Sequence, residues 1–431
     1  MLLENPETRR LVCKLRDDID LGDDNDATWV WTKLLDPRLS EQGQVFSTRR
    51  LFQSLPSDKL RGFSRSAVHG EVRLANLNSY FLVTLPNTAN ISQLIHEIRA
   101  ARDIELAYVD PDSGLPSQSE PENDPLFGEQ DYLNPAKGGI DIRAAWNVDG
   151  DGRGVCFADV EKDWSLVHLD LIDKQVEELT LPKVTVQPQG SEFSPHGTRV
   201  LQVVLAQDNR LGIIGMAHNV ARGKAFVASC INTHRADAIA LAAARVQQEG
   251  GGVLLIELQQ DGAGCLPIEA AQAEFHAIQT AAFQSPSAPV VVVECAGNGE
   301  TNIDPALAVL GADSGAIMVG AVKSGVTHRK LLKSNFGTRV NCHAWGEKVR
   351  TSEDDTFNGT SSAGAIIAGV CCVVQSVNKQ RLGTFLTSVE MRTKLTSFPL
   401  VRQPRRGPRP PGNDLVGVMP DLQKIIDSIH T

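Results

Sequence analysis

The sequence predicts a doubly wound α/β fold built on a mostly parallel sheet. Between about residues 126 and 378, short apolar segments alternate with segments of helical periodicity, which is the pattern of repeated strand–helix units. Some apolar segments, such as Val290-Val291-Val292-Val293, have no polar face, and this is typical of parallel strands covered on both sides. In such sheets, functional side chains gather beyond the carboxyl ends of the strands.

The individual elements follow from apolar runs and capping residues. We expect strands at 154–159, 224–229, 253–258 and 289–295, and helices at 197–206, 236–248 and 268–283. A further helix should begin near Ser361, where a glycine-led turn precedes a long run of small and apolar residues.

Residues 1–110 are expected to form a separate small α+β unit. Alternating residues near Tyr80 predict a strand, apolar residues at helical spacing behind Asn90 predict a helix, and the segment from Ile104 to Tyr108 predicts a returning strand. Residues 111–125 are rich in Pro, Ser and acidic residues and should be a linker. The main domain is assigned to residues 126–378, and residues 379–431 to an extension packed on it, with a solvated basic loop at 402–412.

Composition excludes several classes of function. The net charge of −10 disfavours a nucleic-acid partner, which needs a basic surface. The longest nearly apolar run, 363–374, is shorter than the about 20 residues that span a bilayer, so no membrane helix is expected. The strand and turn at 154–161 lack the glycine pattern of a dinucleotide site. Localisation stays open, and the absence of a recognisable leader slightly favours the cytoplasm.

Eight cysteines do not suggest a disulfide framework in a chain of 431 residues. Cys156 and Cys295 lie inside apolar strand segments and should be buried, reduced thiols. The sequence has no CxxC pair, so a zinc knuckle is not expected.

Two segments place reactive residues at the starts of helices. Ser361 follows Gly359-Thr360, where free backbone N–H groups and the positive helix end would stabilise an anion. His196 lies in a loop that leads into a helix, and histidine is the side chain that titrates near neutral pH. Either residue could instead be a simple helix cap.

Two further segments end predicted strands in polar residues. Asp159 ends the segment that starts at Val155 and could orient an imidazole, with Glu161 and Asp163 as competing carboxylates. Asn298, flanked by Gly297 and Gly299, could donate an N–H to a developing oxyanion or simply form a tight turn.

The order Asp, His, Asn, Ser resembles that of the subtilisin-like serine peptidases, whose triad residues follow one another along the chain as Asp, His and Ser. The similar segments are 155–160 with His168-Leu169-Asp170-Leu171, His196-Gly197-Thr198 with 212–217, Ala296-Gly297-Asn298, 334–337, 345–347 and 359–363. The resemblance implies that Asp159 orients His196, that His196 acts as base and then acid, and that Ser361 attacks. It also implies that Asn298 and the Ser361 backbone N–H bind the oxyanion.

The resemblance has departures and further implications. Glu257-Leu258-Gln259-Gln260 stands where the family has a glycine-containing segment that binds substrate backbone, so these residues should narrow or polarise the wall of the substrate pocket. A family calcium loop would use the side chains of Asp170, Gln207 and Asn209 with the carbonyls of Leu211 and Ile213. No cofactor is required, and this calcium would be structural.

The resemblance also implies a polypeptide substrate, and an N-terminal unit that acts as a prodomain, an intramolecular inhibitor that holds a zymogen. We therefore expect a serine endopeptidase that works through an acyl-enzyme. Two alternatives stay open: a catalytically inactive relative that serves as a binding or scaffold protein, and a peptide ligase or cyclase that uses the same acyl-enzyme.

Overall fold

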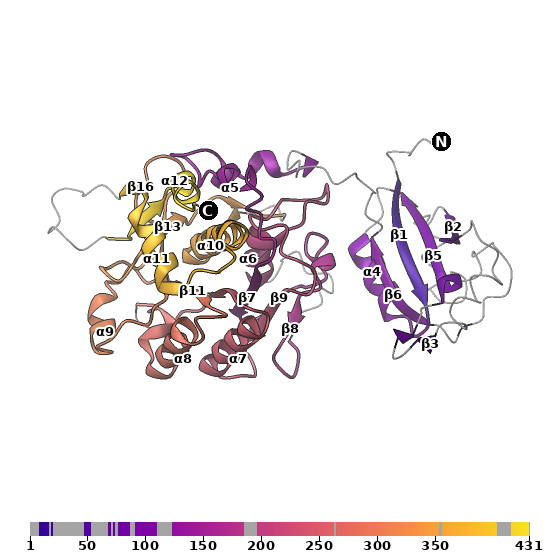
Figure 1. Ribbon diagram of the computed structural model, residues 1–431, viewed down its shortest axis with the longest axis horizontal. Coiled ribbons are helices and arrows are strands. Elements are labelled where there is room, and N and C mark those ends of the chain that lie inside the picture. Colours follow the sequence, from indigo (N-terminus) through magenta and orange to yellow (C-terminus); the bar gives the residue numbers. More distant parts are fainter. Residues whose placement is uncertain are drawn as a thin grey trace. The chain divides into compact units, whose positions relative to one another are not determined.

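The computed structural model describes residues 8–16, 19, 47–52, 68–69, 72–73, 76–86, 91–109, 123–184, 196–262, 264–352, 356–402 and 415–430. The chain forms two compact units, Met1–Pro116 and Ser117–Thr431, which are considered separately (Figure 1). The boundary falls inside the predicted linker, most of which lies outside the described residues.

The N-terminal unit is built on a four-stranded sheet in the order β2-β5-β1-β6. Its elements are β1 (Thr8–Leu15), β2 (Ser47–Arg50), β5 (Tyr80–Pro86), α4 (Ile91–Ala100), β6 (Ile104–Val109), the short strands β3 (Val68–His69) and β4 (Val72–Arg73), and the 3-10 helix η1 (Leu77–Ser79). The predicted strand, helix and strand are present as β5, α4 and β6. Sequence periodicity did not reveal β1, which pairs antiparallel with both β5 and β6 and lies between them.

The larger unit contains a nine-stranded sheet, which confirms the predicted fold class. In spatial order its strands are β16 (Pro399–Arg402), β17 (Val418–Pro420), β13 (Cys342–Trp345), β12 (Ile317–Val322), β11 (Val290–Cys295), β10 (Gly252–Ile256), β7 (Cys156–Glu161), β9 (Ala225–Ser229) and β8 (Glu177–Glu178). All neighbouring pairs are parallel except β16 and β17. The first predicted strand starts and ends two residues later than expected, so Glu161 rather than Asp159 is its last residue.

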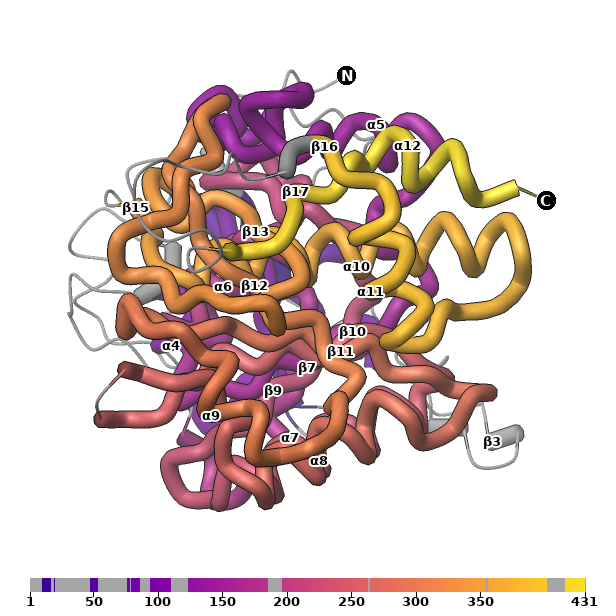
Figure 2. Tube along the Cα trace, turned by 90° about the vertical axis from the view of Figure 1, so that its left-hand side faces the viewer, coloured from indigo at the N-terminus to yellow at the C-terminus, as the bar shows by residue number. Residues whose placement is uncertain are grey.

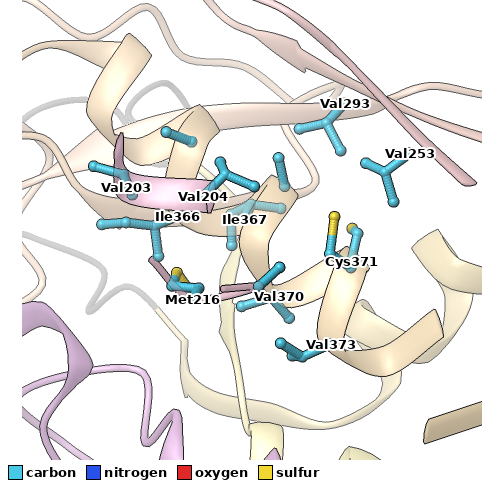
Figure 3. Close-up of a cluster of buried hydrophobic side chains, with 14 of the residues drawn as sticks. Val203, Val204, Met216, Val253, Val293, Ile366, Ile367, Val370, Cys371 and Val373 are labelled. Atoms are coloured by element: carbon cyan, nitrogen blue, oxygen red, sulfur yellow. The ribbon is translucent and has the colours of Figure 1, made fainter. Parts of the chain in front are cut away.

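Helices cover both faces of this sheet. The long helix α10 (Thr360–Leu382) and α6 (His196–Leu205) pack on one face, against Phe157, Leu255 and other odd-numbered residues of β7 and β10. Figure 3 shows part of this layer, where Ile366, Ile367 and Val370 of α10 meet strand and α6 side chains. On the other face, α7 (Arg235–Gln248) and α8 (Gln272–Phe283) pack against even-numbered residues such as Ala158 and Leu254.

Residues beyond 378 complete the sheet. Strand β17 pairs with β13, and helices α11 (Ser388–Ser397) and α12 (Leu422–Asp427) place Met391, Leu422 and Ile425 in the same core as α10 (Figure 2). The predicted basic loop at 402–412 lies outside the described residues except for Arg402.

The remaining described elements are short. They are α5 (Arg143–Trp146), α9 (Asp304–Ala308), β14 (Val349–Arg350), β15 (Thr356–Phe357), and the 3-10 helices η3 (Phe127–Glu129), η4 (Asp131–Leu133), η5 (Ile172–Lys174) and η6 (Ile268–Ala270).

Helix α10 is long and apolar enough to cross a bilayer by length and composition, but 94% of its most apolar window is buried inside the protein. It is therefore the central core helix of this unit. All eight cysteines are unbridged, and Cys156 and Cys295 are buried as expected. Burial raises the pKa of the Cys156 thiol to about 12.

His343 of β13 gives the fold a predictable sensitivity to acid. Its ring is fully buried, and burial, with the nearby His328, lowers its pKa to about 3. The unfolded chain binds a proton near pH 6.5 that the folded chain cannot hold. The free energy of unfolding should therefore fall as the pH drops below about 6.5, by about 1.5 kcal/mol down to pH 5 from this group.

Urea unfolding at a series of pH values tests this expectation. His343→Leu should flatten the acid limb of the stability profile, whereas the same substitution at the exposed His276 should leave its slope unchanged. A His343→Leu profile that runs parallel to wild type would contradict the assignment.

Candidate active site

A pocket of about 290 Å³ lies at the carboxyl ends of β7, β10 and β11 and at the N-terminal ends of α6 and α10. It is lined by Glu161, Lys162, His196, Glu257, Leu258, Gln259, Asp261, Cys295, Asn298, Thr360 and Ser361. The fold thus brings together His196, Asn298 and Ser361, which the sequence predicted as partners.

Strand register decides which side chains reach this pocket. Glu161 is paired with Ser229 of β9. On the other side of β7, Glu257 follows Ile256 and Cys295 follows Glu294, so both lie level with Glu161 at the edge of the sheet. Residues two apart on a strand point to the same face. Asp159 therefore lies on the same face as Glu161 but one step further inside the sheet, where its neighbours are Val227 and Leu255.

Glu161 is the carboxylate that contacts the histidine. The distance from Glu161 Oε2 to His196 Nδ1 is 2.6 Å, and the backbone N–H of Lys162 donates to Glu161 Oε1 at 2.6 Å. Both carboxylate oxygens therefore have partners that favour the charged form. The His196 side chain is 43% exposed, and its ring packs edge-on against Phe357.

Asp159 does not take the place that the sequence analysis gave it. It is fully buried, and its Oδ2 accepts a hydrogen bond from Trp164 Nε1 at 2.8 Å. Burial, with the nearby charge of Glu161, raises its pKa well above the usual range. The strand continues one step beyond Asp159, so the contact with His196 falls to Glu161. Asp163, the other competitor, makes no hydrogen bond to His196 in the described part of the chain.

Asp159 nevertheless supports the histidine indirectly, through Trp164. The indole that donates to Asp159 also packs against Gly197, where an added Cβ would lie 2.5 Å from Trp164 Nε1. The hydroxyl of Thr198 accepts a hydrogen bond from Ser165 N at 2.7 Å. The start of α6, and with it His196, is therefore fixed to the segment that follows β7.

Ser361 occupies the first turn of α10 and is 8% exposed, lining the same pocket as His196. Gly359, the cap residue, has φ of 101°, a left-handed conformation that favours glycine. The hydroxyl of Ser362 donates to Gly359 O at 3.0 Å. This geometry holds Ser361 at the positive end of a long helix.

Asn298 lies beside the turn at Gly359-Thr360 in a defined orientation. Its Oδ1 accepts a hydrogen bond from Thr360 N at 2.9 Å, which leaves the Nδ2 amide on the other side, where Gln259 Oε1 lies 3.3 Å away. Sequence reasoning missed the support below this loop. Buried Asn335 donates to Ala296 O and accepts from Gly299 N and Thr301 N.

Glu257 places a second carboxyl group next to Ser361. It accepts a hydrogen bond from Cys295 Sγ at 3.2 Å, and burial, with the carboxyl groups of Asp159 and Glu161 adding to it, raises its pKa well above the usual range. A hydrogen bond with the Ser361 hydroxyl lowers the pKa of Glu257, but this effect is smaller than that of burial. The surroundings of Glu257 therefore favour its neutral form. Gly364 makes room for it, since a Cβ there would lie 3.0 Å from Glu257 Oε1.

Three of the four predicted wall residues line the pocket, namely Glu257, Leu258 and Gln259. Gln260 instead turns toward the neighbouring loop, where its backbone N–H donates to Leu266 O and its amide to Pro267 O.

The predicted calcium loop is compact, and its side-chain oxygens have protein partners. Asp170 Oδ2 accepts from Ile213 N and Ser352 Oγ, Gln207 Oε1 from Asp173 N, and Asn209 Oδ1 from Leu211 N. No cluster of three or more His, Cys, Asp or Glu side chains suited to a metal occurs among the described residues.

Asp124, which the sequence analysis did not select, lies beside this loop and brings a further carboxylate to it. It is buried, and its Oδ2 has no hydrogen-bond partner of normal geometry among the described residues. Burial and the nearby charge of Asp208, with a smaller effect of Asp170, raise its pKa to about 8. The loop therefore combines an unsatisfied carboxyl oxygen of Asp124 with the nearby acidic groups of Asp208 and Asp170.

Comparison with known proteins supports the fold. No family model matches the sequence, and no curated protein matches it. Among solved structures, a protease from Pseudoalteromonas arctica PAMC 21717 is 21% identical, with a TM-score of 0.51 over 73% of this chain and 100% of that one. A cold-adapted subtilisin-like serine proteinase is 19% identical, with a TM-score of 0.44 over 70% of this chain and 99% of that one. A lanthipeptide protease is 17% identical, with a TM-score of 0.48 over 72% and 97%.

The chain is thus similar in fold to the first of these proteins, a protease from Pseudoalteromonas arctica PAMC 21717. Sequence identities of this size are evidence for the fold alone. The roles of single side chains have to be argued from the geometry of the pocket.

Proposed function

We propose that this protein is a serine endopeptidase that hydrolyses peptide bonds through an acyl-enzyme, with Ser361, His196 and Glu161 as its triad. The observation that carries the proposal is the 2.6 Å contact between Glu161 and His196 in a pocket that Ser361 also lines. It lies at the carboxyl edge of a subtilisin-like sheet, which is where such folds place their chemistry.

Each residue has a role that follows from its position. His196 would remove the proton from the Ser361 hydroxyl as its oxygen bonds to the scissile carbonyl carbon, and would then give that proton to the leaving amine. Water, activated by the same imidazole, would release the acyl group. The Asn298 Nδ2 amide and the Ser361 backbone N–H would bind the oxyanion at the positive end of α10.

Glu161 suits the third role because it contacts the imidazole directly. A triad carboxylate must fix the tautomer of the imidazole and stabilise its protonated form. Glu161 Oε2 lies 2.6 Å from His196 Nδ1, whereas Asp159 is buried against Trp164 and burial raises its pKa. Asp159 is therefore a positioning residue that acts on His196 through Trp164.

We further propose that the N-terminal unit is an intramolecular inhibitor that is removed by self-cleavage. It is a compact unit with its own apolar core, which includes Leu11, Val83 and Ile95. Such a unit can fold around its own residues and be released as a whole.

The nucleophile is tested by labelling with a fluorophosphonate probe. Wild-type protein should be labelled and, on incubation, cleaved between its two units, because both reactions need an activated Ser361 hydroxyl. Ser361→Ala should abolish labelling and cleavage without a change in melting temperature, and Ser397→Ala, at an exposed serine of α11 outside the pocket, should keep both. N-terminal sequencing of the fragments locates the cut.

Labelling that persists in Ser361→Ala would refute the assignment of the nucleophile. A folded wild-type protein that is neither labelled nor active on peptide libraries after removal of the N-terminal unit would favour a binding or scaffold role.

The two carboxylates make a matched pair of variants. Glu161→Gln removes the charge beside His196 and should lower kcat by a factor on the order of 10³–10⁴. Asp159→Asn replaces a neutral acid by a neutral amide of the same shape and should keep kcat within about fivefold. Steady-state kinetics on a peptide substrate measures both. A large loss in Asp159→Asn together with an active Glu161→Gln would restore Asp159 as the triad acid.

We also propose that calcium binds the loop around Asp170, as a structural ion with no part in the chemistry. The residues fit a cation, because the unpartnered oxygen of Asp124 and the carboxylates of Asp170 and Asp208 crowd negative charge into one place. Asn209 and Gln207 would add neutral oxygens of the kind that calcium accepts.

Calcium removal tests this site. Addition of calcium to chelator-treated protein should raise the melting temperature, with about 2.7 kcal/mol of stabilisation at 100 times the dissociation constant. Asp124→Asn should reduce the shift, whereas Asp131→Asn, at an exposed carboxylate further along the same segment, should keep it. An equal melting temperature with calcium and with chelator would exclude a structural ion.

A further inference from the structure

We infer that the Gln259 side chain gates the active site. Its carbonyl oxygen accepts a hydrogen bond from the Asn298 side-chain amide, which would otherwise donate to the carbonyl oxygen of the substrate. The inference rests on the proposed function and adds to it a residue that controls entry of the scissile bond.

In this contact, two N–H groups of Asn298 donate to one oxygen of Gln259. Gln259 Oε1 accepts from the backbone N–H of Asn298 at 3.0 Å and faces the Asn298 Nδ2 amide at 3.3 Å. An amide carbonyl oxygen in this place has the same chemistry as the carbonyl oxygen of a peptide substrate. One N–H of the amide proposed to stabilise the oxyanion is thus already bonded within the protein.

Both sides of the contact are held in place. The Asn298 side chain is fixed by the Thr360 N–H, and its loop by Asn335. Preceding Gly297 has φ of 91° and closely approaches Cys265 O, so this turn has little freedom to shift. On the other side, the backbone of Gln259 is bridged to Pro267.

The flexible part of the contact is therefore the Gln259 side chain itself. It is half-buried and lines the pocket next to Ser361 and Asn298. A substrate carbonyl can take the place of Gln259 Oε1 between the two Asn298 donors only after this side chain rotates away. The free energy needed to break the hydrogen bonds of Gln259 therefore weakens the binding of every substrate.

Truncation of the side chain should therefore speed up the enzyme. In Gln259→Ala, the Asn298 amide is open to the substrate, and the second-order rate of fluorophosphonate labelling should rise roughly three- to thirtyfold. The kcat/KM for a peptide substrate should rise by a similar factor. Gln259→Glu keeps an acceptor oxygen of the same reach and should show no acceleration.

Gln260→Ala is the matched comparison, since it removes the same side chain at the next position, where the amide is bonded to Pro267 O instead. It should not accelerate labelling. The double variant Asn298→Ala/Gln259→Ala tests whether the faster labelling depends on Asn298. Once the Asn298 amide is absent, Gln259→Ala should give no further increase in the labelling rate.

The outcomes separate this inference from the proposed function. Labelling of wild type that depends on Ser361, with an unchanged or slower rate in Gln259→Ala, would overturn the gate and leave the peptidase intact. Acceleration in Gln259→Glu or Gln260→Ala would also overturn it. Labelling in Gln259→Ala but not in wild type would support both ideas, and its absence from both folded proteins would overturn both.

Discussion

The contact between Glu161 and His196 depends on the pleat of a single strand, and the rest of the site depends on that contact. Side chains two apart on β7 share a face, so only the last of the series Phe157, Asp159 and Glu161 reaches beyond the sheet. The first lies in the apolar core, the second between core and site, and the third against the imidazole. Two residues along the strand separate a carboxyl group bonded to Trp164 from one that contacts the imidazole.

The same sheet edge carries a second acidic group, Glu257, in a different environment. Glu161 accepts from the Lys162 N–H and contacts the His196 ring. Glu257, one strand away, is buried against Cys295 and Ser361, and this burial raises its pKa well above the usual range. The edge therefore holds one carboxyl group directed at the imidazole and one whose neutral form is favoured.

Small and amide side chains determine how closely these groups approach. Glycines stand where a Cβ would meet Trp164, Cys295 or the backbone of the Cys265 loop, at positions 197, 364 and 297. Asn335 joins three loops from below. The Gln259 side chain, which lies on the proposed oxyanion donor, is the element of the pocket that we propose to move.

The sequence by itself determined the fold class and the segments that build the site. Apolar periodicity predicts the parallel sheet and its helices, and the residues near His196, Asn298 and Ser361 could be selected because glycines, helix starts and strand ends are local signals. The sequence could not choose between Asp159 and Glu161, since both lie on one strand face and only the end of the sheet separates them. The roles of Asp124, Asn335 and Gln259 were likewise decided by the tertiary structure, because each depends on contacts between segments far apart in the chain, and local patterns carry no record of such contacts.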